Sequence, residues 1–206
     1  MDIYSTEEQQ AEAIKRFFRE NGLSLALGVA IGLGGLYGWK AYNQSQITTA
    51  ENASDAYTQL VEGGAVLGAA DTFIAEHKDT NYSVLAAFVA AKEAVEKDQL
   101  DVASEKLSWV VENVNNADLK ATATTRLARV QIAQQQYDQA LSTLNGEFAD
   151  SFTATVAELK GDIYTAQGDV NQARTAYQAA ADAGGLENNP LLQIKLDDLA
   201  VTSPAA

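Results

Sequence analysis

Side chains that could carry out chemistry are sparse in this chain of 206 residues. The sequence has one histidine, His77, and no cysteine. A metal site or an activated nucleophile needs several such groups together, so His77 is expected to be a surface residue. The neighbouring acids Asp197 and Asp198 point in different directions on a helix, which disfavours an acid–base pair. With no phosphate-binding, dinucleotide-binding or calcium-binding motif present, we expect no catalysis, no metal and no cofactor.

The charge of the chain is mostly negative and unevenly spread. Fourteen Lys and Arg residues stand against 28 Asp and Glu residues, for a net charge of −14. Residues 1–42 are nearly neutral at −1, so residues 43–206 carry −13. Contacts to phosphates need Lys and Arg, so we expect no nucleic acid among the partners. The pattern indicates a small N-terminal segment joined to an acidic domain.

The stretch from Asn21 to Trp39 is typical of a membrane-spanning helix. These 19 residues contain no charge, and as a helix they span ~28 Å, close to the ~30 Å hydrocarbon core of a bilayer. Tyr37, Trp39 and Tyr42 gather at one end, where aromatic rings favour the interface. A buried core helix and a cleaved signal peptide are the alternatives. The length of the run and the polar sequence after it favour an uncleaved anchor.

Basic residues flanking this stretch predict its orientation. Lys15, Arg16 and Arg19 precede it, whereas only Lys40 follows before Lys78. Because positive residues stay on the cytoplasmic side, the acidic domain is expected outside, in the bacterial periplasm. We expect a single-pass protein of the inner membrane. Its predicted parts are a cytoplasmic N-terminal helix at 1–20, a transmembrane helix at 21–42 and a periplasmic domain at 43–206.

Small residues form one face of the predicted membrane helix. This face consists of Ser24, Gly28, Gly32 and Gly35. Small residues at such spacing let a second membrane helix approach closely, so the face is a candidate lateral contact. Glycine is also frequent in membrane helices in general, and that is the alternative explanation.

Beyond about residue 43 the apolar residues follow helical spacing, and polar breaks divide the sequence into segments. Three alanines provide a register: Ala103, Ala140 and Ala173. Twelve residues before them stand the small residues Ala91, Ala128 and Gly161. Four residues after them stand the large residues Leu107, Leu144 and Tyr177. We expect the small residues to let paired helices approach, and the large ones to fill the groove between successive pairs.

This pattern resembles the tetratricopeptide repeat, most clearly over residues 159–180. The expected fold is all-α: a single N-terminal transmembrane helix, then a tetratricopeptide-like solenoid of antiparallel helix pairs, closed by a helix over 186–200. A generic alanine-rich bundle is the alternative. The resemblance implies a groove on the first helices, with the candidate residues Phe88, Lys92, Thr125, Arg129, Glu158 and Asp162. Lys92 and Arg129 would suit an acidic peptide, unless they are simply exposed.

Over essentially the whole chain the sequence is similar to the YfgM family. The stretches that carry the similarity are residues 14–22, the glycine-rich span and residues 85–92. The resemblance implies an ancillary subunit of the Sec translocon, SecYEG, that works with a membrane-anchored periplasmic chaperone of the PpiD type on unfolded or emerging client proteins. Repeat spacing by itself implies only a protein-binding module. An inner-membrane adaptor for envelope assembly or cell division is the alternative function.

Overall fold

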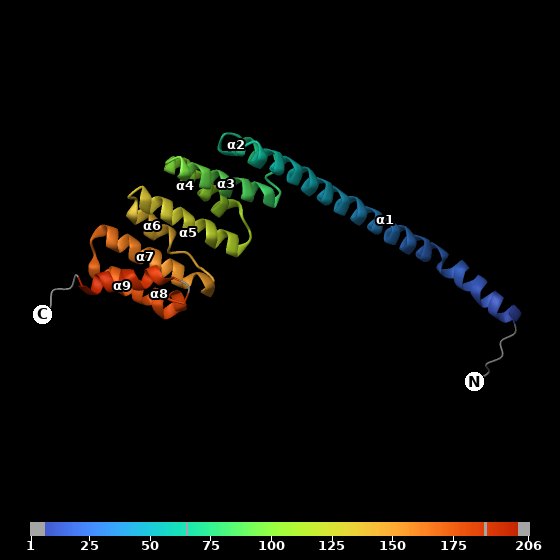
Figure 1. Cartoon of the computed structure of the whole chain (residues 1–206). Helices are drawn as coiled ribbons and strands as arrows, with labels where there is room; N and C mark the ends of the chain where they lie inside the picture. Colours follow the sequence, from blue (N-terminus) through green and yellow to red (C-terminus); the bar gives the residue numbers. More distant parts are fainter. Residues whose placement is uncertain (1–6, 65, 188, 202–206) are drawn as a thin grey trace. The chain divides into compact units, whose positions relative to one another are not determined.

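A computed structural model describes residues 7–64, 66–187 and 189–201, which contain helices and no strand (Figure 1). Contacts divide the chain between Asn52 and Ala53 into an N-terminal unit and a repeat domain. The expected all-α class is confirmed, with one long apolar N-terminal helix followed by paired helices.

The first helix, α1 (Glu7–Glu62), contains the predicted membrane segment. The sequence analysis separates residues 1–20 from 21–42, but α1 runs from Glu7 through Asn21 and past Tyr42 without a break. Its apolar side chains project outward, with Leu23 78% and Ile31 74% exposed. The helix is long and apolar enough to cross a membrane. Residues 1–6 of the predicted cytoplasmic helix lie outside the described residues, and the predicted membrane boundaries stay predictions.

The repeat domain consists of short helices that alternate in direction along a stack (Figure 1). Successive helices pack against each other, and α3 with α4, α5 with α6 and α7 with α8 form the three pairs. The bounds are α2 (Val66–Glu76), α3 (Asn81–Glu96), α4 (Leu100–Asn113), α5 (Ala117–Ala133), α6 (Tyr137–Thr143), a 3-10 turn (Asp150–Phe152), α7 (Thr153–Gln167), α8 (Val170–Ala180), a π-helical turn (Ala181–Gly185) and α9 (Pro190–Val201).

The core runs along the stack as a series of buried clusters that join neighbouring pairs. Leu107 of α4 lies in one cluster with Leu127 and Val130 of α5. Leu144, just after α6, lies in another with Leu159 and Ile163 of α7. Burying a leucine contributes about 1.5–3 kcal/mol, and here each one is covered by the next pair rather than its own pair alone. The pairs therefore stabilise one another by stacking.

Helix α9 occupies the place of the first helix of a fourth pair. It packs on α8 as α5 packs on α4. Spacing by 33 residues puts Ile194 at the position of Gly161 and Lys195 at that of Asp162. Ile194 is 54% and Leu191 62% exposed, because no second helix follows α9 in the part of the chain that the structure describes. The predicted closing helix over 186–200 thus corresponds to α9.

The turn inside each pair has the same backbone geometry. One residue is left-handed in each: Asp98 (φ 59°), Gln135 (φ 61°) and Gly168 (φ 79°). Each stands five residues before an aligned alanine. The next N–H in each turn reaches back into the preceding helix: Gln99 to the carbonyl of Ala94, Gln136 to Gln131 and Asp169 to Tyr164, at 2.8–2.9 Å. This is the Schellman arrangement, which glycine favours because it has no Cβ.

We predict that Gln135→Gly raises the free energy of unfolding by roughly 0.5–1 kcal/mol, since it removes a strained left-handed side chain. Thermal unfolding followed by circular dichroism measures the effect. The control is Ala133→Gly, two residues earlier in helical backbone, which should lower stability by about 1 kcal/mol. A lower stability for Gln135→Gly would contradict the assigned turn.

Candidate protein-interaction site

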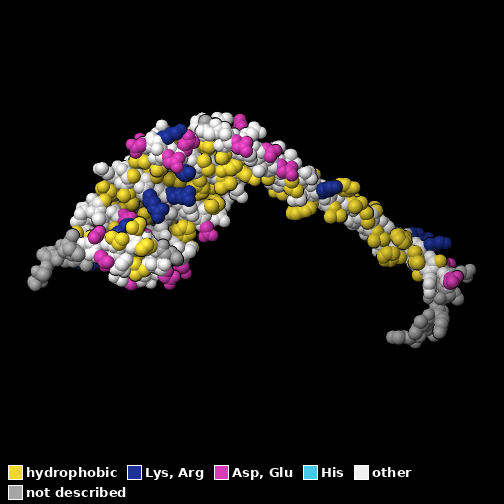
Figure 2. All heavy atoms as spheres, in the orientation of Figure 1, with side chains coloured by type: hydrophobic (Ala, Val, Ile, Leu, Met, Phe, Trp, Pro, Cys, Tyr) yellow, Lys and Arg dark blue, Asp and Glu magenta, His cyan; other side chains and the backbone are white. Residues whose placement is uncertain are grey.

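A groove of about 600 Å³ lies on the repeat domain between α3 and α5. Its apolar lining comes from Phe88 and Val95 of α3, Leu100 and Leu107 of α4 and Val130 of α5. All of them except the exposed Val95 belong to the cluster that packs the first two pairs together. Figure 2 shows basic side chains beside a hydrophobic area on the repeat domain. The groove therefore offers apolar surface and positive charge at one place.

Three cations surround the groove. Lys92 lies 3.3 Å from Glu96, which also lines the groove. The guanidinium of Arg126 lies 5.0 Å from the ring centroid of Phe88, a cation–π contact that holds it over the groove. Arg129 lines the groove one turn further along α5. Among the described residues neither arginine makes an ion pair, so their charge is available to a ligand.

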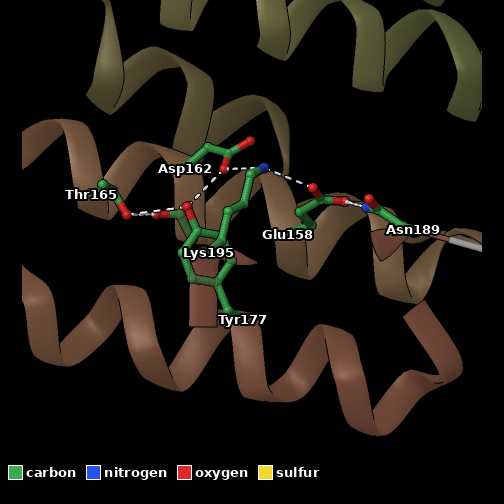
Figure 3. A network of polar contacts seen from close by, with 7 residues as sticks. Glu158, Asp162, Thr165, Tyr177, Asn189 and Lys195 are labelled. Atoms are coloured by element: carbon green, nitrogen blue, oxygen red, sulfur yellow. Dashed lines mark hydrogen bonds and ion pairs between the residues drawn. The ribbon is translucent and has the colours of Figure 1, made fainter. Parts of the chain in front are cut away.

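The corresponding surface of the third pair is filled by the chain itself (Figure 3). Lys195 of α9 donates hydrogen bonds to Glu158 at 2.7 Å and to Asp162 at 2.6 Å, both on α7. The side-chain amide of Asn189 donates to the other oxygen of Glu158 at 2.8 Å. Burial by itself lowers the pKa of Lys195, but the hydrogen bonds and charges of the two carboxylates outweigh it and raise the pKa. This network attaches α9 to α7.

Tyr177 of α8 completes the network. Its hydroxyl donates to Asp162 at 2.7 Å and lies 3.1 Å from the hydroxyl of Thr165. Burial raises the pKa of Tyr177 well above its ordinary range, and Asp162 adds to the rise although Thr165 acts against it. Lys195 lies 5.5 Å from the centre of the same ring.

A buried cation joins α2 to α4. Lys106 is 3% exposed and donates hydrogen bonds to Asp71 at 2.5 Å and to Glu105 at 3.0 Å. Burial by itself lowers the pKa of Lys106, and the two acids outweigh it, so the pKa is raised. This contact fixes neighbouring helices and leaves no free cation for a ligand.

The structure brings together three of the six groove residues of the sequence analysis, and Glu158 is not among them because it accepts a hydrogen bond from Lys195. Phe88, Lys92 and Arg129 line the groove, whereas Asp162 lies in the Lys195 network. Thr125 does not face the groove, because it is buried and its hydroxyl donates to the carbonyl of Ala121 at 3.0 Å.

The residues aligned for packing lie inside the repeat domain. Eight of the nine are at most 3% exposed: Ala91, Ala103, Leu107, Ala128, Ala140, Leu144, Ala173 and Tyr177. The ninth, Gly161, faces the Tyr177 ring so closely that an added Cβ would lie 2.3 Å from ring atoms. The first two pairs combine alanine with leucine at these positions. The third pair combines glycine with tyrosine, so the smaller residue makes room for the larger one.

The small-residue face of α1 is open. Added Cβ atoms at Gly28, Gly32 and Gly35 would meet nothing within 4 Å, and Ser24 is exposed.

The ring of His77 packs against the ring of Phe73, with 4.6 Å between the two ring centroids. In the described residues no group of three or more His, Cys, Asp or Glu side chains is arranged to hold a metal.

Two residues that matter here were missed by the sequence analysis. Arg126 stands one helical turn before Arg129, and this spacing would have placed both on one side of α5. Lys195 stands 33 residues after Asp162, and Asp162 stands 33 after Arg129. Extending the repeat register by one step would have placed Lys195 beside Asp162.

The fold and the groove define a helical-repeat module of the kind that binds proteins. The family model described as a tetratricopeptide repeat-like domain matches residues 15–201. A protein of Escherichia coli is 38% identical over 207 residues, which cover 98% of this chain and all of the relative. Relatives from Haemophilus influenzae (30% identity, 94% and 97% coverage) and Neisseria gonorrhoeae (28%, 97% and 100%) also match.

All three relatives are named ancillary SecYEG translocon subunit. The chain belongs to this family, the YfgM family, as the sequence resemblance indicated. The apolar helix α1 and the name of the relatives fit a membrane-associated protein. No solved structure matches the chain.

We predict that Gly161→Ala lowers the free energy of unfolding by about 1–3 kcal/mol, since overpacking against Tyr177 exceeds the ~1 kcal/mol gained in helix propensity. The double variant Gly161→Ala with Tyr177→Leu recreates the combination of the other pairs. The double variant should lose less free energy of unfolding than the two single variants lose in sum. Thermal unfolding of the four proteins measures this coupling, and additive losses would contradict the proposed compensation.

Alkaline pH should destabilise the repeat domain. Folding raises the pKa of Tyr177, Lys106 and Lys195, so the unfolded chain releases their protons first as the pH rises. The stabilisation is complete below the ordinary pKa values of about 10 and is lost above them. We expect Tm to fall as the pH rises above about 10, and less steeply in Tyr177→Phe. A Tyr137→Phe control should keep the steep fall, and a flat profile in the unmodified protein would refute this prediction.

Proposed function

We propose that this chain is a single-pass inner-membrane protein that acts as a non-enzymatic ancillary subunit of the Sec translocon. The observation that carries the proposal is the full-length identity of 38% to a protein named ancillary SecYEG translocon subunit. The similarity covers both the apolar helix and the repeats, so it supports a shared role of the whole chain.

The proposed orientation has the segment before the span in the cytoplasm and the repeat domain in the periplasm. Lys15, Arg16 and Arg19 on one side against Lys40 on the other support it, because basic residues are retained in the cytoplasm. The apolar side chains of the span are exposed along α1, and a bilayer would cover them.

The repeat domain then serves as a docking platform. In this proposal it links the channel to a membrane-anchored periplasmic chaperone of the PpiD type and to unfolded or emerging client proteins. Tethering by α1 raises the effective concentration of the groove near chains that leave the channel. The groove between α3 and α5 supplies apolar and cationic surface for such contacts.

The small-residue face of α1 supplies the lateral contact within the membrane. Ser24, Gly28, Gly32 and Gly35 leave room for the backbone of a partner helix, and helices in lipid associate through such close packing. Leucine at these positions would keep the partner helix away.

Affinity purification of the tagged chain in mild detergent tests the proposal. We expect the channel subunits and the membrane-anchored chaperone to co-purify. Recovery should fall several-fold for Gly28→Leu with Gly32→Leu, because the added side chains block close packing. The control is Gly22→Leu with Gly34→Leu, which adds the same bulk away from this face.

Two outcomes would count against the proposal. Recovery of division or wall-synthesis proteins in place of channel subunits would support the envelope adaptor instead. Unchanged recovery with leucine at Gly28 and Gly32 would refute the lateral contact.

A further inference from the structure

We propose that the groove between α3 and α5 binds a short extended peptide segment in which carboxylates stand beside apolar side chains, with Arg126 and Arg129 binding the carboxylates. This inference rests on the proposed function, since it assumes that the domain binds proteins. It specifies the chemistry of the segment that is bound.

The apolar half of the ligand follows from the lining. Phe88, Val95 and Leu100 present hydrophobic surface to a groove of about 600 Å³, and the buried Leu107 and Val130 lie beneath it. That volume lies within the range of about 300–1,000 Å³ typical of ligand pockets, and it holds a few side chains rather than a folded domain. Apolar side chains of a peptide would bury this surface and their own.

The charged half follows from the cations. The groove is lined by Lys92, Arg126 and Arg129 against one carboxylate, Glu96, although residues 43–206 carry a net charge of −13. Lys92 is paired with Glu96, which leaves the two arginines as the charges without an ion-pair partner among the described residues. Arginine binds carboxylates through two parallel hydrogen bonds. Charge complementarity therefore selects an acidic segment.

Arg126 is held ready for such a ligand. Its guanidinium is 5.0 Å from the Phe88 ring centroid, so its position is restricted before binding. A restricted side chain loses less conformational freedom when the ligand arrives. The same ring lines the groove, so one residue of the lining positions the cation beside the apolar surface.

The third pair limits the length of the site. The repeat position filled by Lys92 and Arg129 is filled there by Asp162, and Lys195 from α9 binds both Asp162 and Glu158. Beyond α5 an acidic ligand would meet two carboxylates and one cation that is already engaged. The ligand site is thus confined to the first two pairs.

Fluorescence anisotropy tests the inference on the full chain in nanodiscs of zwitterionic lipid. The probe is a labelled peptide of about twelve residues that alternates leucine with glutamate. We expect Arg126→Ala with Arg129→Ala to weaken binding about tenfold or more, and glutamine in place of glutamate to do the same. Raising the salt from about 50 mM to about 300 mM should also weaken binding.

The matched control removes two exposed cations outside the groove, by Lys78→Ala with Lys120→Ala. Its binding should stay within about twofold of the unmodified chain, since distant exposed charges are screened. Equal binding by the arginine variant and this control would overturn the inference, as would equal binding of the glutamine peptide. Because Arg126 and Arg129 are exposed, the variant should keep its Tm.

Co-purification separates this inference from the proposed function. If the peptide fails to bind while the channel subunits still co-purify with the unmodified chain, only the groove assignment is wrong. If the channel subunits fail to co-purify while the arginines still bind the acidic peptide, the translocon role is wrong and the groove assignment stands.

Discussion

Apolar surface that must leave water determines how both parts of this chain are built. The repeat helices cover their apolar faces by stacking, so that Leu107 and Leu144 are buried by the following pair. The apolar side chains between Asn21 and Trp39 have no such cover among the described residues, and Leu23 and Ile31 are mostly exposed. Only a bilayer or other helices can cover them. Membrane association and helix stacking thus both remove apolar surface from water.

Stacking in turn depends on how closely the helices approach. Alanine or glycine on the first helix of each pair sets that distance, and the third pair shows the limit, where Gly161 lies against the Tyr177 ring. The larger ring brings a hydroxyl into the interface, and this hydroxyl donates to Asp162, which also accepts from Lys195. The tyrosine that replaces leucine at this packing position therefore also takes part in the polar network that attaches α9. In the same network Lys195 binds both Glu158 and Asp162.

Much of the fold could be predicted from the sequence, because helical spacing and repeated small residues are local signals. The expected all-α class and the family were confirmed. The continuity of α1 through Asn21 and past Tyr42 was not predicted, since charged and aromatic residues mark membrane boundaries without ending a helix. Phe88, Lys92 and Arg129 line one groove, and their role there stays a prediction. Arg126 was missed because its place beside the groove involves a contact with Phe88 on another helix. The hydrogen bond from Lys195 to Asp162 likewise joins residues that are 33 positions apart, and amino-acid composition does not reveal such a pair.

The proposed function requires that α1 crosses the inner membrane and that the repeat domain lies on its periplasmic side. The chain has no cysteine, so single cysteines report position without background. The direct measurement is labelling of Glu12→Cys and Gln139→Cys in intact cells made permeable only in the outer membrane, with a maleimide that cannot cross the inner one. The account predicts that the cysteine at 139 reacts at once and the cysteine at 12 only after the inner membrane is opened. Labelling of the cysteine at 12 with protection of the one at 139 would contradict it.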